Sequence, residues 1–262
     1  MDNVVADHLI VTAAGGTPLV RDVSFQLPSG TLTALVGPNG AGKSSLVRAL
    51  AGLQSARGSI IIGGRNIADL SPIERARILA WLPQAHPPAW PVKVRDAVAT
   101  GRFAYGGAGG RLCPTDHAAV ATAMAECDIV QLADRRIDTL SGGEIARVHL
   151  ARCLSAQTTT ILADEPVAAL DPANRLAVMD ILRDRAVAGA TILVVLHDLV
   201  LAARYADRII AMADGRIVAD GTPQAVITPI FMQSVFGVVA TTDVIDGHIV
   251  PVIRGMAASA TG

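Results

Sequence analysis

Lysine is scarce in this sequence: only two of the 22 basic residues are lysine, Lys43 and Lys93. Basic charge is not in excess either, because 23 acidic residues leave a formal net charge of -1. A protein that holds nucleic acid by bulk electrostatics needs such an excess, so we expect no nucleic-acid partner. In a chain that otherwise uses arginine, each lysine needs its own explanation.

Long apolar runs are also missing, although 51% of the 262 residues are hydrophobic. The longest strongly apolar stretches, such as Ile192–Leu196, are far shorter than the roughly 20 residues of a membrane-spanning helix. The first residues, MDNVVADHLI, carry no basic leader, so no signal peptide is predicted. Cys113, Cys127 and Cys153 are odd in number and lack C-x-x-C spacing, so we expect neither disulfides nor structural zinc, and a reducing cytosol as the environment.

Short β-branched runs alternate with helix-like stretches. Thr31–Val36, Thr160–Ala163 and Thr191–Leu196 are predicted as buried strands, and each precedes a helical pattern. This alternation predicts an α/β fold with a parallel sheet. Asp214-Gly215, between two apolar segments, predicts a hairpin.

The middle of the chain has a different character. Gly101–Arg111 is glycine-rich and is expected to be mobile, and the alanine-rich stretch Thr115–Leu132 predicts a helix. We predict a helical subdomain over approximately 86–145; an ordinary long loop followed by a helix is the alternative. One domain is predicted over 1–254, followed by a flexible tail at 255–262.

The segment GPNGAGKS, from Gly37 to Ser44, fits the pattern G-x-x-x-x-G-K-[ST] between a predicted strand and a predicted helix. Its glycines let backbone N–H groups wrap a phosphate, and the start of the helix adds positive potential. We expect Lys43 to reach the β- and γ-phosphates and the Ser44 hydroxyl to bind Mg²⁺. A glycine turn that merely caps a helix is the alternative, and the predicted strand before the segment together with the helix after it disfavours that alternative.

Two acids end an apolar strand at Asp164 and Glu165. Beside a phosphate loop, the first acid holds Mg²⁺ and the second polarises the attacking water. Gln84 and His197 also follow predicted strands, although a single histidine is often only structural. Because ligands of open α/β sheets bind outside the carboxyl ends of the strands, these polar residues predict one site on one rim.

Ser141-Gly142-Gly143-Glu144 has two interpretations. Ser141 and Glu144 would form a capping box for the helix Ile145–Leu154. That box does not explain the two glycines, each of which costs about 1 kcal/mol relative to alanine inside a helix. Paired glycines at a helix start favour close approach of a phosphate. Because the chain already has one phosphate loop, this second segment predicts a partner's nucleotide and a head-to-tail dimer.

With these segments in this order, the sequence resembles the nucleotide-binding subunit of ABC transporters over essentially the whole chain. The matching segments are the Walker A loop (Gly37–Ser45), the Q-loop (Gln84), the signature (Leu140–Glu144), the Walker B strand (Ile161–Glu165), the D-loop (Ala169–Asp171) and the switch histidine (His197). The resemblance implies a P-loop NTPase with a mostly parallel central sheet, an antiparallel β portion and an inserted helical subdomain.

The resemblance also implies the role of each site residue. Glu165 is the general base, His197 clamps the γ-phosphate, and Gln84 senses Mg²⁺ and couples to the membrane subunits. Mg²⁺ is held by Ser44, Gln84 and Asp164. ATP is bound by Gly37, Pro38, Asn39, Gly40, Ala41, Gly42, Lys43, Ser44 and Ser45. The signature residues Leu140, Ser141, Gly142, Gly143 and Glu144 contact the partner's ATP, and Asp171 belongs to the D-loop.

Three positions depart from the family pattern. Thr12-Ala13-Ala14 has no aromatic residue of the kind that stacks on adenine. Glu144 stands where glutamine is commoner, and Ile145 stands where arginine is frequent.

Within the family the chain resembles the bacterial importers of iron–siderophore, haem and cobalamin, with siderophore placed first. The features that carry this are Trp81–Gln84, Leu196–Leu199, Gly221–Pro223 and Phe231–Phe236 with Val250-Pro251. The implied partners are a second copy of the chain, two transmembrane permease subunits and, indirectly, a periplasmic or extracellular binding protein. The implied location is peripheral, on the cytoplasmic face of the bacterial inner membrane.

Other functions stay open. The ATPase motifs do not fix the direction of transport, so another ABC transporter, including an exporter, is an alternative. A soluble ABC ATPase acting on ribosomes or DNA generally has two nucleotide domains or long coiled coils, which are not visible in this sequence. An unrelated P-loop kinase would have no use for the segment Ser141–Glu144.

Overall fold

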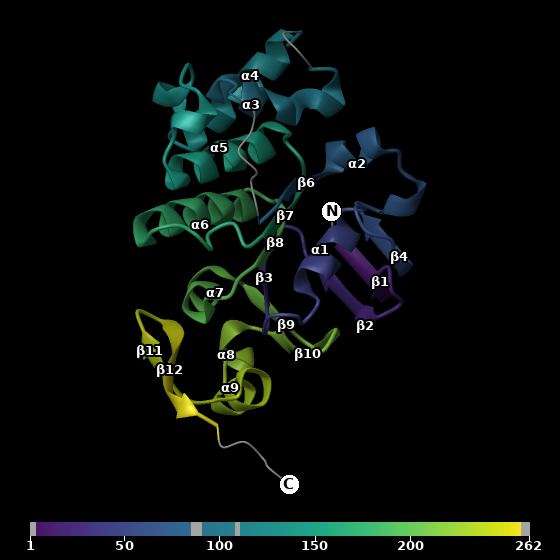
Figure 1. The fold of residues 1–262 in the computed structure, drawn as a ribbon, viewed down its shortest axis with the longest axis vertical. Helices are drawn as coiled ribbons and strands as arrows, with labels where there is room; N and C mark the ends of the chain where they lie inside the picture. Colours follow the sequence, from purple (N-terminus) through teal and green to yellow (C-terminus); the bar gives the residue numbers. More distant parts are fainter. Residues whose placement is uncertain (1–3, 85–90, 108–110, 258–262) are drawn as a thin grey trace.

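A six-stranded sheet in the order β10-β9-β3-β8-β7-β6 forms the centre of the computed structural model, which describes residues 4–84, 91–107 and 111–257 (Figure 1). All neighbouring strands from β9 to β6 are parallel, and β10 is antiparallel to β9. The predicted parallel sheet and the Asp214-Gly215 hairpin are therefore confirmed. The strands are β3 (Leu32–Val36), β6 (Leu79–Leu82), β7 (Thr160–Asp164), β8 (Thr191–Val195), β9 (Arg208–Ala213) and β10 (Arg216–Gly221).

Both faces of this sheet are buried along its inner strands β3, β7 and β8. In β8, Ile192 and Val194 belong to the core on one face, and Leu193 and Val195 belong to the core on the other. Successive side chains of a strand point to opposite faces, so a strand covered on both sides is apolar throughout. This explains why the predicted strands are continuous apolar runs.

A second, antiparallel sheet has the order β2-β1-β4-β5. Helix α1 (Lys43–Leu50) shares a core with both sheets: its Leu46 packs in one cluster with Leu9 of β1 and Leu35 of β3. The helix ends at Leu50 with Ala51 as its C-cap, and the left-handed Gly52 (φ +68) follows. The bounds are β1 (Val4–Thr12), β2 (Pro18–Leu27), β4 (Arg57–Ile62) and β5 (Arg65–Asn66), followed by the 3₁₀ helix η1 (Ile67–Asp69).

Helices occupy the chain between β6 and β7, and they lie at the top of Figure 1. They are α3 (Val94–Ala99), η2 (Thr100–Tyr105), α4 (Pro114–Glu126), η3 (Val130–Leu132), η4 (Ile137–Thr139) and α5 (Gly142–Ser155), and α2 (Pro72–Ile78) precedes β6. Helix α5 begins earlier than the predicted Ile145, because Ser141 is its N-cap, and it continues beyond residue 145. The subdomain bounds of 86–145 stay a prediction, since residues 85–90 lie outside the described ranges.

The glycine-rich segment Gly101–Arg111 is more ordered than expected over its first half. It forms η2, and the buried Arg102 donates from Nε to Oδ1 of Asp116 in α4 at 2.8 Å and from Nη1 to the carbonyl oxygen of Ser155 at 3.0 Å. A buried arginine that is satisfied in this way ties η2 to α4 and α5. Residues 108–110 lie outside the described ranges.

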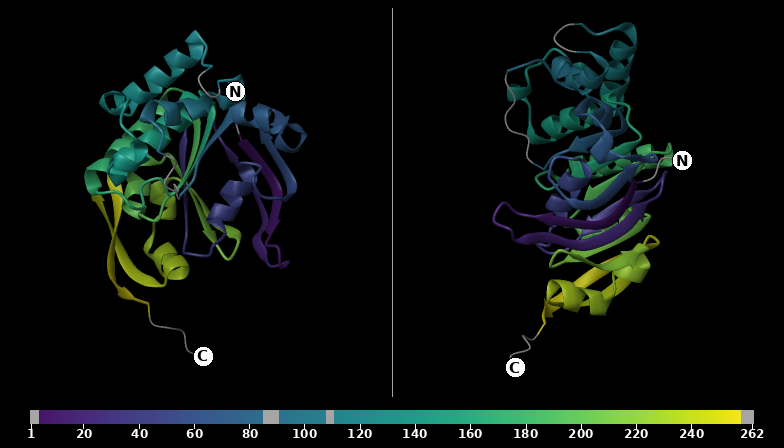
Figure 2. Two further views of the ribbon diagram at one scale, coloured as in Figure 1. Left: turned by 45° about the horizontal axis from the view of Figure 1, so that its top comes forward. Right: turned by 90° about the vertical axis from the view of Figure 1, so that its right-hand side faces the viewer.

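The last elements, from α8 to β12, lie at the bottom of Figures 1 and 2 and end in a two-stranded hairpin. Gly255 and Met256, expected in the tail, belong to β12; residues 258–262 are not described. No helix in the described ranges is long and apolar enough to cross a membrane. The remaining elements of the chain are α6 (Pro172–Val187), α7 (Leu199–Tyr205), α8 (Pro223–Val226), α9 (Pro229–Phe236), β11 (Val238–Ile245) and β12 (His248–Met256).

Candidate nucleotide site

The phosphate loop, residues 37–44, connects β3 to α1. Gly37 (φ +144) and Gly42 (φ +96) have left-handed backbones, which favour glycine. A Cβ atom at Gly37 would lie 2.1 Å from the carbonyl oxygen of Met212, and one at Gly42 would lie 2.2 Å from that of Leu19. These two glycines are therefore required by the packing of the loop against β9 and β2, in addition to any contact with phosphate.

Lys43 is buried inside this loop, with 6% of its surface exposed. Its Nζ donates to the carbonyl oxygens of Gly37 at 2.7 Å and Pro38 at 2.9 Å. Burial lowers the pKa of Lys43, and the charges of Glu165 and Asp164 oppose that shift. A desolvated ammonium at the first residue of a helix is well suited to bind phosphate oxygens.

Ser44 and Asp164 meet beside Lys43. The Ser44 hydroxyl donates to Oδ1 of Asp164 at 3.1 Å, and Asp164 is 1% exposed at the end of β7. Burial raises the pKa of Asp164, although the hydrogen bond from Ser44 opposes the rise. A buried carboxylate paired with a hydroxyl gains most from a nearby cation.

This donor set fits Mg²⁺, which takes oxygen ligands and is usually held by one or two carboxylates together with substrate phosphates. Across residues 4–84, 91–107 and 111–257, no group of three or more His, Cys, Asp or Glu side chains is placed to hold a metal by itself. A divalent ion at Ser44 and Asp164 would therefore depend on the nucleotide for further ligands.

Glu165 lies between Gln84 and His197. Nε2 of Gln84 donates to Oε2 of Glu165 at 2.6 Å, and Nε2 of His197 lies 2.5 Å from Oε1. The backbone of Glu165 is left-handed (φ +52), which is uncommon for a residue with a side chain and is often found at functional sites. The ends of β6, β7 and β8 thus bring together three side chains that are far apart in the sequence.

The signature segment forms the predicted capping box. The Ser141 amide donates to Oε2 of Glu144 at 2.7 Å, and the Glu144 amide donates back to Oγ of Ser141 at 3.4 Å. The bonds that the amide and the hydroxyl of Ser141 donate to Oε2 hold the pKa of Glu144 below its ordinary value. A Cβ atom at Gly142 would meet nothing within 4 Å, so the packing of this chain does not explain that glycine.

The structure does not bring the signature to the phosphate loop of the same chain. Leu46 of α1 belongs to the core on one face of the central sheet, whereas Val148 and Leu150 of α5 belong to the core on the other. The signature is adjacent to the D-loop instead, because Gly143 lies against Asn174 in α6, and Asp171 is the N-cap of that helix.

Three neighbours of the site are not predicted by the motifs: the carbonyl groups of Leu19 and Met212, and the side chain of Asn174. The two carbonyls belong to strands remote in the sequence and leave no local pattern. Asn174 has a local signal, because Asp171-Pro172 is typical of an N-cap followed by the first helical residue, which puts Asn174 at the third.

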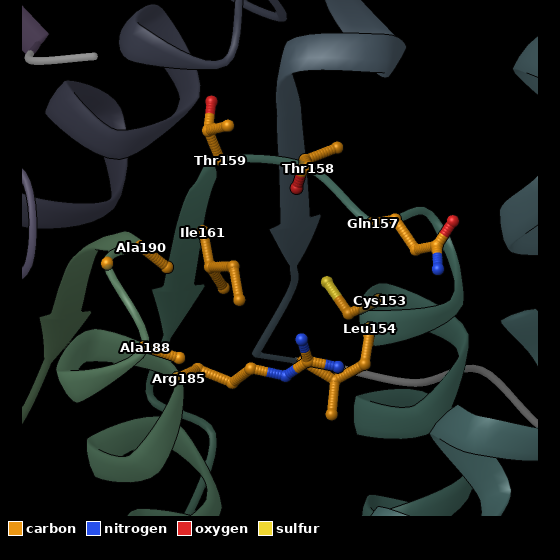
Figure 3. A pocket seen from close by; sticks show the side chains of 10 residues that line it. Cys153, Leu154, Gln157, Thr158, Thr159, Ile161, Arg185, Ala188 and Ala190 are labelled. Atoms are coloured by element: carbon orange, nitrogen blue, oxygen red, sulfur yellow. The ribbon is translucent and has the colours of Figure 1, made fainter. Parts of the chain in front are cut away.

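A separate hollow of about 200 Å³ lies at the amino ends of β7 and β8, opposite the site (Figure 3). Figure 3 shows the Arg185 side chain extending toward Cys153 and Leu154. Arg185 is already paired with Glu126 at 2.5 Å. This hollow offers neither a phosphate loop nor paired acids.

Comparison with known proteins identifies relatives of this chain. The ABC transporter family matches residues 20–168. The hemin import ATP-binding protein HmuV of Nocardia farcinica is 45% identical over 238 residues, which are 88% of this chain and 81% of that protein. The protein of the same name from Pseudomonas putida is 41% identical over 230 residues, 86% of this chain and 89% of that protein.

Solved structures have the same fold. The ATP binding subunit of an ABC transporter matches with a TM-score of 0.75 and 25% identity over 86% of this chain and 92% of that one. The ADP conformation of MJ1267, an ATP-binding cassette of an ABC transporter, matches in fold with a TM-score of 0.78 and 22% identity, over 89% of this chain and 96% of that one. The chain belongs to the ABC transporter family, as a subunit that binds and hydrolyses ATP.

Proposed function

We propose that this chain drives haem import by hydrolysing Mg²⁺-ATP between two copies of itself, bound to a membrane permease on the cytoplasmic face of the inner membrane. The observation that carries the proposal is the grouping of Lys43, Asp164 and Glu165 at one rim of the sheet. A buried ammonium, a buried acid with a hydroxyl partner and an oriented carboxylate are the groups that phosphoryl transfer to water requires.

The site residues have distinct roles in this proposal. The amides of residues 37–45 and Nζ of Lys43 bind the phosphates of ATP. Ser44, Asp164 and Gln84 hold Mg²⁺, which neutralises charge on the phosphate oxygens when bound. Gln84 and His197 orient the carboxylate of Glu165, and each of its oxygens keeps a second lone pair to accept the proton of the attacking water.

Dimerisation follows from the separation of the phosphate loop and the signature. The start of α5 presents the backbone of Gly142, and a Cβ atom added to this glycine would meet no atom of another segment within 4 Å. A helix start of this kind attracts an anion. A second copy arranged head to tail supplies that anion, the γ-phosphate of its own ATP, so that Ser141 and Gly143 close one site and the D-loop Asp171 lies at the interface.

This chain has a surface beside Gln84 that is suitable for binding the permease. A groove of about 350 Å³ lies next to β6, and its lining includes Trp81, Pro83 and Phe103. Phe103 is 69% exposed, and an exposed aromatic side chain at a groove is typical of a protein interface. Because β6 leads directly to Gln84, a permease bound in this groove contacts the strand that positions a residue of the ATP site.

The Phe103→Asp substitution is expected to weaken binding of the permease at least about tenfold, because it places a charge in an apolar interface. Co-purification of the two proteins in detergent measures this. Val187→Asp is the matched control, since Val187 is 72% exposed and lies on α6, outside the groove. Equal recovery of the permease with both variants would contradict the assignment of the groove.

Haem is placed ahead of siderophore and cobalamin because the relatives reported above are named hemin import proteins. The cargo is tested with the complex of this chain and its co-purifying permease in liposomes. We expect ATP-dependent uptake of haemin, which unlabelled ferric siderophore and cobalamin do not compete away. Uptake of a siderophore but not of haemin would contradict the assignment of haem as the cargo. ATP-driven efflux would contradict the assignment of the transporter as an importer.

A further inference from the structure

Asn174 lies between the signature and the D-loop of the same chain. We propose that Asn174 is a positioning residue that joins these two segments into one unit, so that both approach the partner's nucleotide together. This inference rests on the proposed ATP-bound dimer. It assigns a role to a residue outside all of the motifs in the sequence.

The link to the D-loop consists of two hydrogen bonds. The backbone N–H of Asn174 donates to Oδ1 of Asp171 at 2.9 Å, and its side-chain Nδ2 donates to Oδ2 at 2.6 Å. These bonds also lower the pKa of Asp171, so the carboxylate stays charged and retains both contacts. Nε of Arg175 donates to the carbonyl oxygen of Leu170 at 2.7 Å, which fixes the preceding residue of the loop.

The link to the signature is a close packing contact. A Cβ atom at Gly143 would lie 2.5 Å from Nδ2, 2.6 Å from Cγ and 2.8 Å from Oδ1 of Asn174. All three distances are below any that a real Cβ atom tolerates, so the amide of Asn174 lies directly against the backbone of Gly143. Gly143 is therefore a glycine for two reasons, the neighbouring Asn174 and the expected phosphate, whereas Gly142 has only the second.

The two links use the same side chain, and this couples the segments. The amide of Asn174 cannot move away from Gly143 without losing its bond to Oδ2 of Asp171. Conversely, a shift of Asp171 displaces the side-chain amide of Asn174, and Gly143 then loses the group against which it packs. The distance between the signature and the D-loop is thus set inside one chain before the partner arrives, which lowers the cost of assembling the closed site.

A double-mutant cycle tests this coupling. The variants are Asn174→Ala, Gly143→Ala and their combination, with Gly142→Ala combined with Asn174→Ala as the matched control cycle. The measurements are kcat and KM for ATP, the melting temperature, and ATP-driven dimerisation by size exclusion in the Glu165→Gln background. Asn174→Asp is a second single variant of nearly the same size that keeps the contact with Gly143; its side-chain carboxylate cannot donate to Oδ2 of Asp171, and only the backbone bond to Oδ1 remains.

We expect Asn174→Ala and Asn174→Asp each to lower kcat about tenfold, because small misplacements of closing groups are costly. KM for ATP should stay near the wild-type value, since the nucleotide binds first to the phosphate loop, and the melting temperature should change little. The combined Gly143→Ala and Asn174→Ala variant should be no slower than the slower single variant, because the clash is gone. In the control cycle, the factors by which Gly142→Ala and Asn174→Ala each lower kcat should multiply in the combined variant.

Two results would overturn the role of Asn174. One is wild-type kcat and dimerisation in both Asn174 variants. The other is multiplication of the Gly143→Ala and Asn174→Ala losses, which would mean that the two residues act independently. A wild-type chain that hydrolyses ATP without dimerising would instead contradict the proposed dimer, and this inference with it; that failure is visible without any variant.

Discussion

The Glu165→Gln variant is expected to lose ATP turnover by about a thousandfold while still binding ATP, because a neutral amide cannot take a proton from the attacking water. The substitution preserves the size of the side chain and leaves one oxygen to accept a bond from Gln84 or His197. The site can therefore still close. We expect the variant to accumulate as an ATP-bound dimer, because the closed dimer reopens only after the ATP has been hydrolysed.

Phosphate release and size exclusion in the presence of Mg²⁺-ATP measure the two effects. Glu74→Gln is the matched control: Glu74 lies in the capping box of α2, away from the nucleotide site, and glutamine serves equally well in such a box. We expect wild-type turnover from it. Unchanged turnover in Glu165→Gln would remove Glu165 from the role of general base, whatever the dimer does.

Much of this site can be predicted from the sequence because its residues follow the ends of parallel strands. Gln84, Glu165 and His197 come after three apolar runs, and parallel strands end at a common rim. The sequence does not show that β6, β7 and β8 are direct neighbours. That order depends on pairings such as Leu82 with Ala163, which no local pattern encodes.

Contacts between segments that are far apart in the sequence could not be predicted from it. The glycines of the phosphate loop have a visible motif, but the approach of Met212 to Gly37 depends on the backbone paths of two strands. Gly143 and Asn174 are a similar case, since each has a local explanation that omits the other. The hairpin of β11 and β12 differs: it turns at Asp246-Gly247, an Asp-Gly signal of the kind used for Asp214-Gly215, and was predictable.

Lys43→Ala is expected to weaken ATP binding and turnover about a hundredfold or more, because it removes the one buried ammonium from the phosphate loop. It also removes the Lys43 donor from the carbonyl oxygens of Gly37 and Pro38, and of these two Pro38 keeps a hydrogen bond from the Ala41 amide at 3.2 Å. Lys43→Arg should not restore activity, since a planar guanidinium is larger than an ammonium and does not fit between these two carbonyls.

The chain offers one matched control for this experiment, its other lysine. Lys93 has a side chain that is 45% exposed and pairs with Asp134 at 3.0 Å, a surface contact remote from the nucleotide site. Exposed ion pairs of this kind add little to stability, so Lys93→Ala should bind and hydrolyse ATP as the wild type does. Titration with a fluorescent ATP analogue and a phosphate-release assay compare the two variants. If Lys43→Ala binds ATP as tightly as Lys93→Ala, the loop at Gly37–Ser44 does not hold the nucleotide through its lysine, and the scarcity of lysine in this chain has no functional meaning.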